Sequence, residues 1–409
     1  MTDFSIVGGG VSGLVTARRL AASGASVTVH EATDRLGGPV AGHDVAGLAL
    51  DAGAESFAVR GGVVAQLLTE LGLDGDIVAP EPRAAWLQPV TGPAVPLPAT
   101  ALLGIPANPL ADDVVRVVGR DAAERAVELD AAPLGQLPAS LGALVRERLG
   151  ADVLDRLVAP VVHGVHSQHP DQLPVERAHP ALRDAVAETG SLSAAVARLR
   201  AAAPPGSAVG GIRGGMNRLV TALADDVARL GGDIVLGSRV DDLSTLPGTV
   251  IVAAPGVAAP AAPARRIDLV TLVVEQSELD AAPRGTGLLV AAGAPVAARA
   301  LTHATAKWGW LRDAASGRHV VRLSYDALPA DPIAAAQADA ETLLGVRLPV
   351  VAGTAHVTWL RPAAAPTPAG LTVVGETVAG SGIAGIVVHA ERTAAALLEA
   401  PGTAPGAGD

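Results

Sequence analysis

The stretch Phe4-Ser5-Ile6-Val7-Gly8-Gly9-Gly10-Val11-Ser12-Gly13 decides the fold of the N-terminal part of this chain. Its first four residues are predicted to form a short buried strand that leads directly into glycines 8, 10 and 13, which fit G-x-G-x-x-G. Apolar residues at helical spacing follow up to Ala22, and Gly24 ends the predicted helix. Such glycines allow a tight turn, close approach of a pyrophosphate to the backbone, and close packing of a helix on a strand. The stretch therefore predicts the first half of a dinucleotide-binding βαβ unit.

An acidic residue after the second predicted strand supports this prediction. Ser26–His30 is expected to form that strand, and Glu31 follows it. A carboxylate in this place accepts hydrogen bonds from ribose hydroxyls and repels a 2′-phosphate. A plain glycine-rich turn is the alternative in a chain with 47 glycines. We reject it because strand, glycine loop, helix, strand and acid occur in that order.

The segment beyond the acid favours one class of dinucleotide over another. Arg35-Leu36-Gly37-Gly38 and then Asp51–Glu55 follow Glu31. They resemble the two-dinucleotide-binding flavoproteins of the amine oxidase group. The resemblance implies that the arginine supports the diphosphate and that the glycines let the chain pass close to a flavin. A nicotinamide-only dehydrogenase would usually have a plain helix here, so FAD is favoured over NAD.

A distant block that begins at Gly210 continues the predicted domain. Gly210–Leu219 precedes a helix whose apolar residues recur up to Leu230, and strands are expected at Asp233–Leu236 and Val250–Ala254. By the same resemblance this block returns to the FAD domain, with Val240 against the adenine side.

A second G-x-G-x-x-G occurs near the C-terminus, at Gly380–Gly385. We reject a second nucleotide site, because the predicted strand Leu371–Val374 ends well before these glycines. No further strand with a ribose acid follows in the sequence. The helix expected from here to Leu398 is instead predicted to direct its N-terminus at the flavin ring and ribityl chain.

Further segments resemble the protoporphyrinogen/coproporphyrinogen oxidase family in its actinobacterial form. They are Asp51–Phe57, Leu157–Val165 with Pro170–Leu173 and Pro180, Lys307–Gly309 and Arg322–Tyr325 as later strands, and Trp359 as the tryptophan near FAD. The sequence departs from the family at His166–His169, where a tyrosine-glycine-aspartate step is common, and in the short stretch Arg361–Gly370. Both departures concern the substrate pocket rather than FAD binding.

The resemblance implies a flavin oxidase that removes hydride from a porphyrinogen and passes the electrons to O2. The expected products are the porphyrin and H2O2, and coproporphyrinogen III in haem biosynthesis is the favoured substrate. No catalytic side chain is assigned, because the flavin performs the chemistry. The substrate propionates need cations, for which Arg60, Arg177 and Lys307 are the candidates.

The predicted fold is α/β, with a Rossmann-like FAD domain built from residues 1–75, 205–260 and 355–409. A helix-rich subdomain at 76–204 and a strand-rich domain at 261–354 are expected to hold the substrate. The resemblance and the glycine motif together imply the following cofactor-binding residues: Gly8, Gly9, Gly10, Val11, Ser12, Gly13, Glu31, Ala32, Arg35, Gly37, Gly38, Gly53, Ala54, Glu55, Ser56, Val240, Trp359, Ser381, Gly382 and Ile383.

Composition restricts the partners. A formal net charge of −11 argues against nucleic acid, and the absence of cysteine excludes disulfides and thiolate chemistry. The longest uncharged run, Leu243–Ala264, contains four prolines and is not expected to span a membrane. With Asp3 so early, no signal peptide is expected. We expect a cytoplasmic protein; peripheral membrane contact, a downstream haem-pathway partner and the oligomeric state stay open.

Two side-chain clusters allow more than one interpretation. His163, His166 and His169 invite a metal hypothesis, which we reject because Pro170 ends any helix there and no acidic ligand joins them at a recognised spacing. Lys307–Trp310 is interpreted as a strand packed on the inter-domain core, in preference to direct stacking on substrate.

The sequence is also compatible with rival functions. Protoporphyrinogen IX is a rival substrate. An amine oxidase would need an aromatic cage, which two Phe, one Tyr and four Trp hardly supply. A carotenoid-type desaturase and a catalytically degenerate FAD- or porphyrin-binding protein are also compatible with the sequence.

Overall fold

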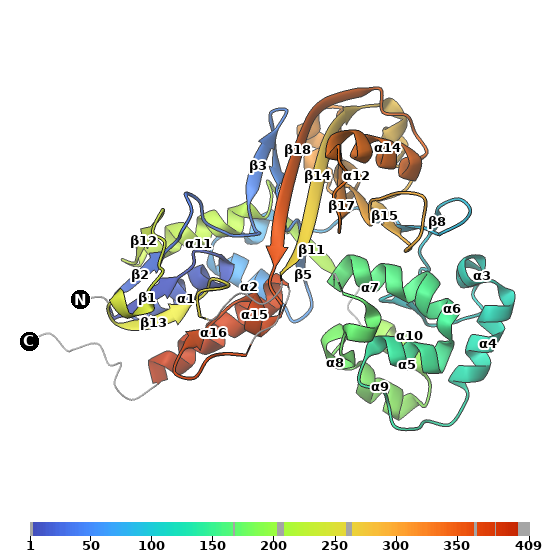
Figure 1. Cartoon of the computed structure of the whole chain (residues 1–409), viewed down its shortest axis with the longest axis horizontal. Helices are drawn as coiled ribbons and strands as arrows, with labels where there is room; N and C mark the ends of the chain where they lie inside the picture. The colour runs from blue at the N-terminus through green and yellow to red at the C-terminus, as the bar shows by residue number, and fades with distance from the viewer. Residues whose placement is uncertain are drawn as a thin grey trace, which may run out of the picture. The chain divides into compact units, whose positions relative to one another are not determined.

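The computed structural model describes residues 3–166, 168–202, 208–258, 264–363, 366–380 and 382–399. The chain forms two compact units, one of residues 1–80, 207–269 and 357–409, the other of residues 81–206 and 270–356. Both combine helices and strands, so the predicted α/β class is confirmed (Figure 1). That the first unit is the FAD domain stays a prediction.

The first unit is built on a parallel sheet with the strand order β12-β2-β1-β13-β19 in the described part of the chain. The helices α1, α11 and α16 belong to the same unit, and α1 contacts both others (Figure 1). The strands are β1 (Phe4–Val7), β2 (Val27–His30), β12 (Asp233–Val235), β13 (Thr249–Val252) and β19 (Thr372–Val373), and the helices α1 (Val11–Ala21), α11 (Asn217–Arg229) and α16 (Ile383–Glu399). The strands and helices predicted here are confirmed to within a few residues.

Register brings the ends of these strands to one edge. Val7 lies opposite His30 of β2 and Val252 of β13, and Val252 lies opposite Val373. Because the strands are parallel, the loops that leave their carboxyl ends gather at this edge, where α/β sheets bind ligands. Smaller elements complete the unit: α2 (Val63–Glu70), β3 (Gly42–Val45), β4 (Leu48–Asp51), β5 (Phe57–Ala58), β6 (Ile77–Val78) and β11 (Val209–Ile212).

The second unit combines a group of helices with most of a mixed sheet, whose described strands run in the order β18-β14-β17-β16-β15-β7-β8. Residues 265–269 of β14 and 357–361 of β18 belong to the first unit. The helices, teal to green in Figure 1, share one apolar core. They are α3 (Asp112–Val118), α4 (Arg120–Asp130), α5 (Leu141–Leu149), α6 (Ala151–Val153), α7 (Ala159–His166), α8 (Val175–Ala178), α9 (Leu182–Thr189) and α10 (Leu192–Ala202). The sheet contains β7 (Trp86–Gln88), β8 (Val95–Pro96), β14 (Arg265–Glu275), β15 (Gly287–Val290), β16 (Ala300–His303), β17 (His319–Tyr325) and β18 (Val350–Arg361). The helix α14 (Pro332–Leu344) contributes to the apolar core of the sheet.

The prediction of a strand at Lys307–Gly309 is wrong. Strand β16 ends at His303, and the chain continues as α12 (Ala304–Lys307) and α13 (Gly309–Ala315). Three consecutive residues, Ala304 to Ala306, are buried, and Trp308 is 3% exposed, with its N–H donating to the Ala304 carbonyl at 2.8 Å. A strand would bury every second residue, whereas a helical turn packed on the sheet buries neighbours together.

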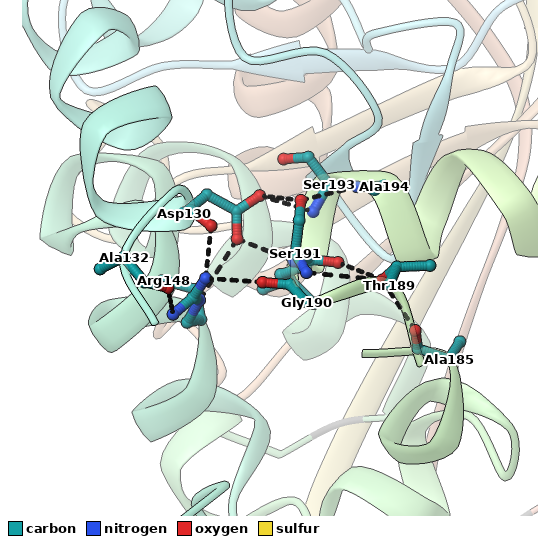
Figure 2. A network of polar contacts seen from close by, with 10 residues as sticks. Asp130, Ala132, Arg148, Ala185, Thr189, Gly190, Ser191, Ser193 and Ala194 are labelled. Atoms are coloured by element: carbon teal, nitrogen blue, oxygen red, sulfur yellow. Dashed lines mark hydrogen bonds and ion pairs between the residues drawn. The ribbon is translucent and has the colours of Figure 1, made fainter. Parts of the chain in front are cut away.

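A buried ion pair joins three of the helices in the second unit (Figure 2). The Arg148 Nε lies 3.3 Å from the Asp130 Oδ1, and both side chains are almost fully buried. Arg148 also donates to the carbonyls of Asp130, Ala132 and Gly190. Asp130 accepts hydrogen bonds from the Ser191 hydroxyl and from the N–H groups of residues 192 and 193, which begin α10.

Removing the arginine of this pair should therefore be costly. We expect R148M to lower the free energy of unfolding by about 3–5 kcal/mol, because the Asp130 charge then stays buried without its cation. The exposed pair of Arg146 and Asp171, 3.0 Å apart, supplies the control. R146M should cost no more than about 1 kcal/mol in the same urea titration followed by circular dichroism. Equal losses in both variants would contradict this account.

Two buried histidines contact each other in the sheet. The His303 Nε2 lies 3.2 Å from the His319 Nδ1, with His303 fully buried and His319 5% exposed. Burial, with smaller contributions from His319 and Arg83, lowers the pKa of His303 to about 3. The folded chain thus holds His303 neutral.

This shift predicts that acid destabilises the protein. Below the ordinary pKa of 6.5 the unfolded chain binds a proton at His303 that the folded chain does not. The free energy of unfolding should therefore fall as the pH falls from 6.5 towards 3, by up to about 1.4 kcal/mol per pH unit from this group. Urea midpoints measured at several pH values should show a shallower slope for H303Q than for the wild type. An unchanged slope in H303Q would refute the assignment.

Candidate dinucleotide site

The glycine loop between β1 and α1 presents backbone donors at the carboxyl edge of the parallel sheet. Its N-terminal end is anchored by the Gly8 N–H, which donates to the His30 carbonyl at 2.8 Å, and the first helical hydrogen bond joins the Leu14 N–H to the Gly10 carbonyl at 3.0 Å. The N–H groups of residues 11–13 come before that bond and have no partner within the helix itself. With the positive end of the helix dipole, these donors suit a diphosphate.

The three glycines of the motif have different steric roles. A Cβ on Gly13 would lie 2.0 Å from the Gly8 carbonyl oxygen, and a Cβ on Gly8, whose φ is +115°, would lie 2.9 Å from the backbone of Ala253. A Cβ on Gly10 would meet no heavy atom of the described residues within 4 Å. Gly8 and Gly13 are therefore needed for packing, whereas Gly10 leaves open space beside the loop, as a bound pyrophosphate requires.

Glu31 is held at the loop by both carboxylate oxygens. Its Oε2 accepts from the Gly9 N–H at 2.8 Å, and its Oε1 accepts from the Thr33 N–H and hydroxyl at 2.9 and 2.8 Å. The Ser238 N–H donates to the Glu31 carbonyl, which places the segment leading to Val240 beside the acid. Val240 is half-buried, and Ala32 is exposed.

A second group of predicted residues meets around Trp359 of β18. The Trp359 Nε1 donates to the Ala52 carbonyl at 2.9 Å, and the Arg35 guanidinium lies 5.3 Å from the centre of the Trp359 ring. Arg35 also donates to the Gly38 carbonyl at 3.1 Å. A Cβ on Gly53 would lie 2.0 Å from the Pro39 carbonyl oxygen. The structure thus brings together three chain segments, around residues 35–39, 52–53 and 359, that the sequence could only propose as neighbours.

The same group is tied to the glycine loop. The Gly37 N–H donates to the Gly9 carbonyl at 2.9 Å, and Gly37 forms a parallel bridge with Gly10. The Ala54 N–H donates to the Pro39 carbonyl, and the half-buried residues Glu55 and Ser56 follow without regular structure.

The C-terminal segment approaches α1 at a residue that the sequence analysis missed. Gly375, with φ +110°, follows β19, and a Cβ there would lie 3.0 Å from the Ser12 Oγ. Next to it, Glu376 begins α15 (Glu376–Ala379) and forms an ion pair with Arg361 at 2.7 Å. Burial raises the pKa of Glu376, and Arg361 opposes the shift. In the sequence, a glycine followed by an acid shortly after a predicted strand could have indicated this position.

The structure describes two of the last three residues in the cofactor prediction. Gly382 has φ +107° and precedes Ile383, the buried first residue of α16. Ser381 lies outside the described residues.

The three candidate substrate cations lie in separate segments of the chain. Arg60 is exposed in a turn after β5 in the first unit. Arg177 is exposed on α8, and the half-buried Lys307 ends α12 with its Nζ 5.1 Å from the centre of the Trp308 ring. Their joint role stays a prediction.

The histidines of the mid-chain segment contact separate carboxylates. The His163 Nε2 lies 2.8 Å from the Asp326 Oδ2, and the His169 Nδ1 lies 3.4 Å from the Asp171 Oδ2. The side chain of His166 lies outside the described part. In that part, no three potential protein ligands meet around one point, and no helix has the length and apolarity to cross a membrane.

The parallel sheet, the glycine loop and the acid after β2 define a Rossmann-type dinucleotide-binding protein. The sequence profile described as "Flavin containing amine oxidoreductase" matches residues 11–260, and the chain belongs to this family. A coproporphyrinogen III oxidase of Mycobacterium leprae is 30% identical over 381 residues, with 83% of this chain and 81% of the relative covered. The one from Mycobacterium tuberculosis strain H37Rv is 29% identical over 455 residues, with 97% and 98% covered.

Solved structures share the whole fold. That of a candidate protoporphyrinogen oxidase from Exiguobacterium superposes with a TM-score of 0.81 at 22% identity, covering 97% of this chain and 98% of the other. The chain is thus homologous to porphyrinogen oxidases over nearly its full length.

The open space at Gly10 predicts a variant that folds but loses its dinucleotide. In G10A the new methyl group clashes with nothing in the described protein and occupies the space expected for the pyrophosphate. We expect the melting temperature of the cofactor-free chain to stay unchanged, while the Kd for FAD, measured by quenching of flavin fluorescence, rises at least about tenfold.

Gly75 supplies the matched control, because a Cβ there also meets no described atom within 4 Å and the residue is not part of the glycine loop. G75A should change neither quantity. If G10A bound FAD with wild-type affinity, the glycine loop would not be part of the FAD site.

Proposed function

We propose that this chain binds FAD and oxidises a porphyrinogen to a porphyrin with O2 as acceptor, releasing H2O2, and that coproporphyrinogen III is its preferred substrate. The observation that carries the proposal is the conjunction of an open glycine loop with full-length similarity to coproporphyrinogen III oxidases at 29% identity. Bound FAD would supply the hydride acceptor, as flavins do in such oxidations.

The residues of the loop would hold the diphosphate through backbone donors. The N–H groups at the start of α1 point towards the open side of the loop, and the helix dipole adds to their attraction for an anion. Arg35, held by Trp359 and the Gly38 carbonyl, adds a fixed positive charge. Glu31 keeps acceptor capacity for ribose hydroxyls, because a carboxylate offers about four lone-pair sites and accepts three hydrogen bonds here.

Similarity to coproporphyrinogen III oxidases supports the substrate preference, and charge makes it testable. Coproporphyrinogen carries more propionates than protoporphyrinogen, and the chain has a net charge of −11, so local cations must hold these carboxylates. Arg60, Arg177 and Lys307 are our candidates. Removing one of them should therefore weaken binding of coproporphyrinogen more than binding of protoporphyrinogen.

An aerobic assay of the FAD-loaded protein tests the function. Porphyrin fluorescence and peroxide should rise together with coproporphyrinogen III, and faster than with protoporphyrinogen IX. Preference for protoporphyrinogen would overturn the substrate, and a yellow protein that accelerates neither reaction would overturn the porphyrinogen assignment. Reduction of its flavin by an amine or a carotenoid would then identify a rival class, and failure with all of them would favour the degenerate carrier.

Variants of the candidate cations test the substrate site. We expect R60M to raise KM for coproporphyrinogen about tenfold with little change in kcat, since a hydrogen bond to a charged group contributes about 1.5–3 kcal/mol. R125M, which removes another exposed arginine on α4, should leave KM unchanged. Equal KM values in both variants would exclude Arg60 from the substrate site.

A further inference from the structure

An acid at the end of the hairpin β3–β4 lies at the start of α11. The Asp51 Oδ1 accepts a hydrogen bond from the Met216 N–H at 2.7 Å, directly before Asn217, the first residue of the helix. N–H groups at the start of a helix lack acceptors within it, and the positive end of the helix dipole attracts a carboxylate. Asp51 therefore caps α11 from a position 165 residues earlier in the chain.

A glycine makes this approach possible. Gly215 has φ +102°, and a Cβ there would lie 3.0 Å from the Asp51 Oδ1 and 2.9 Å from the Asn217 Oδ1. Any other residue at 215 would be strained by this backbone conformation and would press against the carboxylate. The second glycine of the Gly214-Gly215 pair is therefore needed for the contact of Asp51 with α11.

The first turn of α11 also supports the chain on either side of this contact. Gly42 pairs with Asp51 in the antiparallel hairpin, and a Cβ on Gly42 would lie 3.0 Å from the Asn217 Cγ. A Cβ on Gly37 would lie 2.9 Å from the Val220 Cγ2. The hairpin and the loop before it thus rest on α11 at three places.

The segment that these contacts hold is joined to two parts of the candidate site. It consists of residues 37–54, which we call the cofactor strip. At its beginning the Gly37 N–H donates to a carbonyl of the glycine loop at 2.9 Å. Near its end the Ala52 carbonyl, directly after the capping acid, accepts from the Trp359 Nε1 at 2.9 Å. A displacement of the acid would therefore be passed to the backbone beside Trp359.

The cofactor strip is suited to the half of a dinucleotide that lies beyond the diphosphate. In a Rossmann-type site the acid after the second strand, here Glu31, takes the adenosine ribose, and the glycine loop takes the diphosphate. The strip is joined to that loop but supplies neither the acid nor the helix donors. Its end, with the half-buried Ala54, is thus available to the remaining half of the ligand.

We propose that Asp51 is a positioning residue for the flavin half of the bound dinucleotide, acting through its hydrogen bond to the start of α11. This inference rests on the proposed binding of FAD. Without the carboxylate, residues 52–54 lose their anchor on α11, whereas the glycine loop keeps its own packing of Gly13 on Gly8. FAD should therefore lose affinity, and ADP, which ends at the diphosphate, should not.

Titration of the cofactor-free full chain with FAD and with ADP tests this role. D51A should raise the Kd for FAD, measured by quenching of flavin fluorescence, at least about tenfold, because a hydrogen bond to a charged group is lost. Its Kd for ADP, measured by calorimetry, should change less than about twofold. FAD-loaded D51A should also show altered visible circular dichroism, which reports the surroundings of the flavin ring.

The conservative variant D51N gives a second result. Its amide oxygen can still accept from the Met216 N–H but carries no charge, so the Kd for FAD should rise by about threefold at unchanged ADP affinity. D51N decides the question if D51A does not fold.

Asp331 supplies the matched control. Its Oδ1 accepts from the Ala334 N–H at 3.0 Å at the start of α14, a helix of the second unit that has 13 residues, like α11. D331A should lower the melting temperature, because a helix cap is lost, and keep both affinities.

The outcomes separate this inference from the function on which it rests. Equal losses of FAD and ADP affinity in the Asp51 variants, or wild-type FAD affinity in them, would overturn the positioning role and leave FAD binding intact. A wild type that binds no FAD would overturn both.

Discussion

Gly13 packs so closely on the turn after β1 that a methyl group there would sit 2.0 Å from the Gly8 carbonyl oxygen. This contact brings the start of α1 against the end of β1, and Gly8 in turn lies against Ala253 beyond β13. The dinucleotide site depends on it, because only a helix this close directs its first N–H groups at the edge of the sheet. Glu31 and Gly37 then bind the same loop through backbone groups of Gly9.

The two units use polar groups in different ways. The first unit forms its candidate site from backbone donors, glycines and one acid. A ligand would therefore contact mainly backbone groups there. The second buries charged and titratable side chains that already have partners: Asp130 with Arg148, and Tyr325, whose Oη donates to Asp339 at 3.2 Å. Burial and the Asp339 charge raise the pKa of Tyr325, so it acts as a neutral donor.

Much of the first unit could be predicted because its signals are local. The strand at Phe4–Val7, the helix that follows and the acid at Glu31 depend on spacing within a few dozen residues, where periodicity and glycine positions are informative. The strand predicted at Lys307–Gly309 failed because its apolar residues pack on a sheet whose position no local pattern encodes. Gly375 was missed for the same reason, since its close neighbour Ser12 is distant in sequence.

The sequence by itself determined the α/β class, the glycine loop and the family resemblance, because each of these is expressed in the order and spacing of neighbouring residues. Only the tertiary structure decided which glycine leaves open space, that Arg35 lies over Trp359, and that His303 stays neutral beside His319. Steric clearance, ring contacts and desolvation arise when distant segments meet. They therefore depend on three-dimensional packing, which no single stretch of this chain specifies.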